Sequence, residues 1–253
     1  MAFLSNSLSL KTNPLKTFAA GAALAISSIL PLSAAVAAEL ETQVFNPGAK
    51  SLFPVSSTLV TGPTEAILID AQFQRDDAQA VLKMIKASGK ELTTIYISHG
   101  DPDFYFGLDV ITAAYPNAQV VASPETLKHI KKTIKGKVSY WSPILGKNAP
   151  KETILPKLIS DDTLEVDGED LHIVGLDGPD PKHTFVWIPS LKTVTGGVAI
   201  YENVHVWMAD AQDAESRDKW MGTLDSLLAL EPETIIPGHY IGTSPMDKSA
   251  VAC

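Results

Sequence analysis

The sequence predicts an α/β (α+β) protein with one domain behind a removable N-terminal segment. Short runs rich in β-branched and aromatic residues alternate with stretches whose apolar residues recur at helical spacing. Polar residues that can bind metals or transfer protons directly follow several of these runs, and functional residues commonly gather at strand ends. We find no internal repeat, low-complexity segment or second domain boundary.

The first part of the chain has the layout of a secretory signal peptide, residues 1–38. Lys11 and Lys16 precede an apolar stretch at residues 18–32, and a segment of small residues then runs to Ala38, after which cleavage is expected. The apolar stretch is short and is interrupted by serines and a proline, which disfavours the alternative of a permanent membrane span. We therefore expect a periplasmic or secreted protein.

Composition limits the partners of the remaining single domain, residues 39–253. The full chain has a formal net charge of −9, which disfavours nucleic acid because an acidic surface repels phosphate. The one basic cluster, residues 128–137, has the spacing of a solvated helix face. Cys253 is the only cysteine, so no intramolecular disulfide can form. We expect a small-molecule substrate, no nucleic acid and no membrane contact after cleavage, and the oligomeric state stays open.

The first half of the domain reads as alternating strands and helices. Helical spacing of apolar residues, helix-stopping glycine or proline, and a Ser-Pro helix start set the expected limits. The expected strands span residues 55–60, 66–70, 94–98 and 119–122, and the expected helices span 76–87, 103–115 and a segment that starts at Pro124.

The second half contains a predicted loop followed by β-hairpins. Residues 138–160 are rich in Pro, Gly and Lys and predict a long surface loop carrying Trp141, a candidate lid. Asp167-Gly168 is a hairpin signal. The remaining elements are expected as hairpins at 163–166 with 171–175 and at 183–188 with 192–195, a helix at 215–230 and a strand at 234–236.

The stretch SHGDPDFYFG, residues 98–107, allows two interpretations. His99, Asp101 and Asp103 occupy odd positions, so in an extended segment they face one side and could bind a divalent cation. Asp101-Pro102-Asp103 is equally a good helix start, with Asp as the N-cap and Pro in the first turn. The stretch alone slightly favours the cap.

Two other histidines change that balance. His183 lies in a loop that enters a predicted strand, and His239 follows a predicted strand within Pro-Gly-His. Either histidine alone would more often have a structural or exposed role than bind a metal. His129, His172 and His205 keep that simpler interpretation.

Together these segments resemble the metallo-β-lactamase superfamily, whose first motif is H-x-H-x-D-H. The resemblance covers most of the domain and implies a four-layer αβ/βα sandwich of two mixed β-sheets flanked by helices. It rests on four segments that occur in the family's order: Ser98-His99-Gly100-Asp101-Pro102-Asp103-Phe104, Lys182-His183-Thr184, Val194-Thr195-Gly196-Gly197 and Ile236-Pro237-Gly238-His239.

The resemblance also implies which residues bind metal and which family ligands are missing. Phe104 replaces the motif's last histidine, and Gly197 stands where a bridging aspartate is expected, so two metals are not expected. The implied first site consists of His99, Asp101 and His183, and the remnant of the second consists of Asp103 and His239. Phe104 is expected to fill the second-metal space or to form a wall of the substrate pocket.

The expected activity is metal-dependent hydrolysis of an ester, lactone or amide by a mononuclear enzyme. One divalent ion, zinc first and manganese or iron as alternatives, would lower the pKa of a bound water so that hydroxide attacks the carbonyl. Asp103 would orient that water or accept its proton, and His239 would help to stabilise the oxyanion.

Two rival functions stay open from the sequence. One is a non-catalytic binding protein with an eroded metal site, and the other is a β-lactamase proper, a substrate that the fold alone does not establish. The sequence also leaves open whether His205, Asp177 or Asp210 replaces a lost ligand.

Overall fold

The structure is a computed structural model that describes residues 39–251. The predicted signal peptide, residues 1–38, lies outside the described residues. None of the described helices has the length and apolar character needed to cross a membrane.

The first sheet has six strands in sequential order from β1 to β6. β1, β2 and β3 pair antiparallel, and β3, β4, β5 and β6 pair parallel. The sheet is therefore mixed. Its strands are β1 (Glu41–Phe45), β2 (Ser57–Thr61), β3 (Glu65–Ile69), β4 (Glu91–Ile97), β5 (Gln119–Ala122) and β6 (Lys157–Leu158).

The second sheet has the strand order β12-β10-β9-β8-β7, and only the β10–β12 pair is parallel. β11 and β13 form a separate parallel pair that brings Tyr201 beside His239. The strands are β7 (Thr163–Val166), β8 (Glu169–Val174), β9 (Phe185–Ile188), β10 (Thr193–Thr195), β11 (Tyr201–Glu202), β12 (Thr234–Ile235) and β13 (His239–Tyr240).

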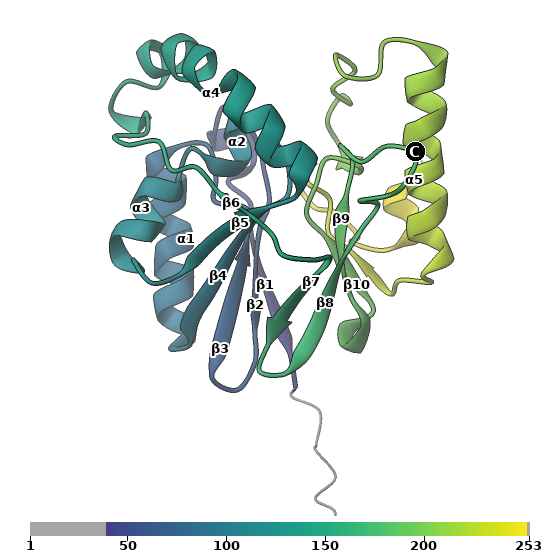
Figure 1. Cartoon of the computed structure of the whole chain (residues 1–253), viewed down its shortest axis with the longest axis horizontal. Coiled ribbons are helices and arrows are strands. Elements are labelled where there is room, and N and C mark those ends of the chain that lie inside the picture. Colours follow the sequence, from purple (N-terminus) through teal and green to yellow (C-terminus); the bar gives the residue numbers. More distant parts are fainter. Residues whose placement is uncertain (1–38, 252–253) are drawn as a thin grey trace, which may run out of the picture. The chain divides into compact units, whose positions relative to one another are not determined.

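Helices cover the outer faces of both sheets, with α1, α3 and α4 beside the first sheet and α5 beside the second (Figure 1). The α-helices are α1 (Arg75–Ser88), α2 (Pro102–Tyr105), α3 (Leu108–Ala114), α4 (Pro124–Leu145) and α5 (Ala214–Ala229). Short 3₁₀ turns occur at Gly48–Lys50, Gly146–Asn148, Pro189–Leu191 and Lys248–Val251.

Neighbouring residues in the central strands point into different cores. Leu59 packs into the core that includes residues of α1, α3 and α4, and the next residue, Val60, packs into the core between the sheets. Phe185 of β9 packs with Leu227 of α5 in a third core. Because side chains alternate across a strand, these three cores separate four layers. The fold confirms the predicted sandwich of two mixed sheets flanked by helices.

The helix expected at 103–115 is divided into α2 and α3. The amide of Gly107 donates to the Gln72 carbonyl at 2.8 Å, and a Cβ at Gly107 would lie 2.1 Å from the Ala71 carbonyl oxygen. The backbone at the break therefore packs against the segment that follows β3, which only glycine permits.

The predicted loop at 138–160 is wrong in its first part, because α4 continues to Leu145. Val138 and Trp141 extend the apolar spacing of the helix, and both pack against the core under the first sheet. The Trp141 ring contacts Phe53 and Phe73 at centroid distances of 5.4 and 5.2 Å. Trp141 is thus part of an aromatic cluster and not of a loop lid.

Candidate metal centre

His99 follows β4 and is nearly buried. Its Nδ1 accepts the backbone N–H of Asp101 at 3.3 Å, which leaves Nε2 without a hydrogen-bond partner among the described residues. Burial lowers the pKa of His99 to about 4, against the smaller opposing effects of Asp101 and Asp103. The ring is therefore neutral at physiological pH, the form in which imidazole binds metals.

His183 is held from two sides. Its Nδ1 bonds to the Asp180 carboxylate at 2.6 Å, and its ring stacks on Trp220 at a centroid distance of 4.5 Å. A carboxylate on one ring nitrogen is the usual partner of a metal-binding histidine, because it fixes the ring with the other nitrogen free. The Nε2 of His183 has no hydrogen-bond partner among the described residues.

His99 and His183 line one small cavity of about 40 Å³. Their ring centroids lie 6.4 Å apart. His129 and Asp210 line the same cavity. In contrast, Asp177 and His205 are exposed and do not line it.

Asp101 occupies the N-cap position of α2, but its side chain makes no capping hydrogen bond. Instead, Lys137 of α4 donates to Asp101 Oδ1 at 2.7 Å and to the Gly100 carbonyl at 3.0 Å. Burial alone would raise the pKa of Asp101, but His99 and Lys137 together lower it. The predicted third ligand is thus an ionised carboxylate that already pairs with a cation.

Lys137 also connects Asp101 to a histidine outside the predicted site. Its Nζ lies 3.0 Å from Nε2 of His129, and His129 Nε2 lies 3.7 Å from Asp101 Oδ1. Burial and the neighbouring Lys137 lower the pKa of His129. A neutral His129 ring can accept a hydrogen bond from the ammonium.

Asp103 and His239 contact each other directly. His239 Nε2 lies 2.7 Å from Asp103 Oδ2, and both side chains are buried. Two ligand atoms on one tetrahedral zinc ion lie about 3.3 Å apart, given metal–ligand distances of about 2.0–2.2 Å. The observed separation is that of a hydrogen bond, so an ion there would first have to part the two side chains.

Phe104 occupies the space between the two halves of the site. Its fully buried ring contacts His99 at a centroid distance of 5.3 Å and His239 at 5.4 Å. Tyr201 stacks on the His239 ring at 5.2 Å. Aromatic carbon therefore separates His99 from His239.

A bridging aspartate would not fit at position 197 on this backbone. Its φ is +77°, and a Cβ there would lie 2.1 Å from the Thr184 carbonyl oxygen. Its amide donates to Ser98 Oγ at 2.7 Å, and Ser98 Oγ donates to Asp70. The segment is held by backbone and hydroxyl contacts that any side chain at Gly197 would disturb.

Comparison with known families identifies the chain. The sequence profile of the metallo-β-lactamase superfamily matches residues 51–239. This chain belongs to the metallo-β-lactamase superfamily.

Solved metallo-β-lactamases share the fold at low sequence identity. DIM-1 metallo-β-lactamase is 18% identical, with a TM-score of 0.59 over 85% of this chain and 94% of that one. The metallo-β-lactamase from Pontibacter korlensis is 19% identical, with a TM-score of 0.55 over 85% and 96%. The enzyme from Hirschia baltica is 14% identical, with a TM-score of 0.55 over 84% and 90%. At these identities the likeness establishes the fold alone.

Members of the metallo-β-lactamase superfamily generally bind divalent metals. Among residues 39–251, no group of three or more His, Cys, Asp or Glu side chains is arranged so that it could hold a metal ion. His183 fits an ion, because its Nδ1 faces the Asp180 carboxylate and its Nε2 is free. His99 accepts at Nδ1 and so carries its proton on Nε2, and it fits an ion there only when the proton moves to Nδ1 and the bond from the Asp101 amide is given up. Asp103 and His239 do not fit a second ion in their present contact.

Sequence reasoning missed several residues that shape the site. Lys137 appeared only as a member of a basic run, although it lies two helical turns after His129. Asp180 precedes His183 by three residues, a local signal that could have identified it as an orienting carboxylate. Trp220 is distant in sequence from His183 and gave no such signal.

Proposed function

We propose that this chain is a hydrolase that uses one divalent cation to cleave an ester, lactone or amide of a small molecule. Zinc is the first candidate for the ion, with manganese and iron as alternatives. One observation carries the proposal: His99 and His183 line the same small cavity, and Nε2 of each ring has no hydrogen-bond partner among the described residues.

The third ligand in this proposal is a carboxylate, either Asp101 or Asp210. Asp101 becomes available if its bond to Lys137 opens, and Asp210 lines the cavity without being the partner of a lysine or arginine among the described residues. Two imidazoles and one carboxylate leave a position for water, as in catalytic zinc sites. When bound, such an ion lowers the pKa of water and polarises a carbonyl.

Asp103 and His239 have the proton-transfer role in this proposal. Asp103 accepts a proton from the attacking water on the carboxylate oxygen that does not face His239, and the hydrogen bond with His239 orients the carboxylate. The Nδ1 atom of His239 is buried and has no partner among the described residues. Tyr201 and Phe104 pack on the His239 ring and keep it in one orientation.

Metal content tests the proposal directly. The purified chain is reconstituted with zinc, dialysed and measured by elemental analysis beside His99→Ala, His183→Ala and His205→Ala. We expect about one equivalent in the wild type and in His205→Ala, because His205 is exposed and outside the cavity. We expect a loss of at least tenfold in affinity for the other two variants. Equal, negligible metal in all four proteins would exclude the hydrolase.

A second candidate is a non-catalytic binding protein on the same fold. The ion pair of Lys137 with Asp101 and the direct contact of Asp103 with His239 favour it, because both satisfy the site without an ion. A protein that binds no metal and hydrolyses neither nitrocefin nor a lactone panel would support this candidate. Nitrocefin cleavage would instead favour a β-lactamase.

We also propose that the chain is exported, on the basis of the charged, apolar and small-residue segments in residues 1–38. N-terminal sequencing of the protein recovered from the periplasm or medium should begin after Ala38. A protein that retains its first residues would contradict export by cleavage.

A further inference from the structure

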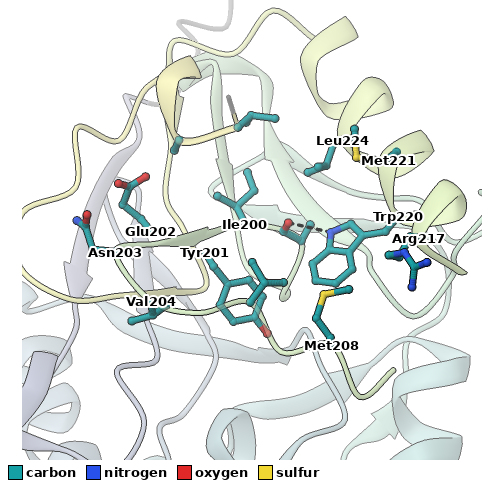
Figure 2. Close-up of a pocket in the computed structure, with 14 residues that line it drawn as sticks. Ile200, Tyr201, Glu202, Asn203, Val204, Met208, Arg217, Trp220, Met221 and Leu224 are labelled. Carbon is teal, nitrogen blue, oxygen red and sulfur yellow. Dashed lines mark hydrogen bonds between the residues drawn. The ribbon is translucent and has the colours of Figure 1, made fainter. Parts of the chain in front are cut away.

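An apolar cavity of about 420 Å³ lies beside the metal centre, between β11, the following loop and α5. This volume is within the range of small-molecule sites, about 300–1,000 Å³. Figure 2 shows Met208 near the Trp220 indole, and Met221 and Leu224 lie on the same helix as Trp220, α5. Ile200 and Val206 add to the apolar lining, and its polar members are Glu202, Asn203 and Arg217.

The cavity and the metal centre share two aromatic walls. Trp220 lines the cavity and stacks on His183 with an interplanar angle of 15°. Its Nε1–H donates to the Ala199 carbonyl at 3.0 Å, which fixes the indole. Tyr201 also lines the cavity and stacks on His239 with an angle of 9°. A ligand in the cavity therefore lies one ring away from both histidines.

The lining favours a neutral chain over an anionic group, because the Glu202 carboxylate also lines the cavity. Val206, Met208 and Met221 line the same cavity and are 44%, 41% and 56% exposed, and apolar side chains grouped on a surface mark binding sites. Methionine also adapts its shape to flexible ligands. The cationic Arg217 is already engaged, because its guanidinium donates to the carbonyls of Ala211 and Gln212.

We propose that this cavity binds the alkyl or acyl chain of the substrate, whose carbonyl then lies at His99 and His183. The substrate class is therefore a long-chain ester, lactone or amide instead of a compact polar one. This assignment rests on the proposed hydrolase function, but the cavity can be tested without metal or turnover. The occupant is argued from proximity, because Trp220 and Tyr201 line the cavity and stack on His183 and His239.

Methyl ketones provide the probe, because they carry a carbonyl and an alkyl chain and cannot be hydrolysed. Binding of 2-heptanone, 2-nonanone and 2-undecanone to the full chain is measured by calorimetry and tryptophan fluorescence, with chelator present. Each added methylene should tighten binding about fourfold, the ratio expected for burying one CH₂. Trp220 fluorescence should change with the same dependence on concentration.

Matched variants on α5 locate the site. Met221→Glu places a charge in the lining and should weaken 2-undecanone binding at least tenfold. Leu228→Glu on the same helix lies outside the cavity, is 37% exposed and should change binding less than twofold. Val206→Glu introduces a charge from the loop after β11. It replaces Met221→Glu as the test if Met221→Glu destabilises the protein, as judged by its urea unfolding midpoint.

The outcomes separate this inference from the proposed function. Binding without chain-length dependence, or equal effects of Met221→Glu and Leu228→Glu, would overturn the cavity assignment. Metal content of the His99 and His183 variants would be untouched by that result. Conversely, chain-length-dependent binding that Met221→Glu abolishes supports the cavity even in a protein that holds no metal.

Discussion

Replacement of Lys137 by methionine tests whether Asp101 is a latent metal ligand. Methionine keeps most of the apolar stem and removes the ammonium. Lys137 donates to Asp101 Oδ1 and to the Gly100 carbonyl, and the two charged side chains are 19% and 27% exposed. Hydrogen bonds to charged groups contribute about 1.5–3 kcal/mol each, and the variant leaves a mostly buried carboxylate unpaired. We expect the metal-free protein to lose about 2 kcal/mol of unfolding free energy.

The same replacement should have the opposite effect on metal affinity. Removing Lys137 takes a positive charge away from the cavity region and frees the Asp101 carboxylate to bind an ion beside His99. Like charges in a poorly solvated site repel strongly, so their removal favours a divalent cation. We expect zinc affinity to rise at least tenfold, which corresponds to about 1.4 kcal/mol.

Two measurements on one pair of variants check both effects. Urea unfolding with chelator gives the stability, and competition with a zinc indicator gives the affinity. Lys135→Met is the control, because Lys135 is an exposed residue of the same helix without an ion pair among the described residues. Equal stability of the Lys137 and Lys135 variants would refute the ion-pair argument. Zinc affinity that stays at or below the wild-type value would exclude Asp101 as a ligand.

Two further predictions concern buried groups that support the site. Burial raises the pKa of Asp70 to about 8 from 3.8, so its stabilising contribution is complete below pH 3.8 and is lost as pH rises to about 8. In the wild type, the free energy of unfolding by urea should therefore fall by about 1.4 kcal/mol per pH unit across that window, and Asp70→Asn should lack this fall. Parallel pH profiles of the two proteins would contradict the prediction. Gly197→Ala should cost at least twice the roughly 1 kcal/mol expected for Gly168→Ala, because both have positive φ but only Gly197 meets the Thr184 carbonyl. Thermal or urea unfolding of the two variants checks the difference, and equal losses would refute the steric argument.

Local patterns were enough to predict most of the fold. The strand at residues 119–122 and the hairpin around Asp167-Gly168 occur as expected, because their signals lie within a few residues. Asp167 and Gly168 both have positive φ, the conformation that the hairpin turn needs. The predicted end of α4 was wrong because proline and lysine are typical of surface loops, whereas the apolar spacing of the helix continues to Leu145.

The contacts of the candidate site were far less predictable. Lys137 reaches Asp101 across 36 positions, and the Asp103–His239 contact spans 136. No periodicity in a single sequence reports such pairs. The two-residue strands β11 and β13 were also missed, because elements that short carry no pattern, although their pairing sets Tyr201 beside His239.

Phe104, Gly197 and the contact between Asp103 and His239 together fill the position of the family's second metal. The half of the site that contains His99 and His183 does not depend on them. Removing the Phe104 ring would open space but leave His239 bonded to Asp103, and no side chain fits at Gly197 without moving the Thr184 carbonyl. A single substitution therefore cannot rebuild that site. His99 and His183 do not share these constraints, because their Nδ1 contacts are to the Asp101 amide and the Asp180 carboxylate. The proposed ion site at His99 and His183 is thus independent of the packing that fills the other half of the site.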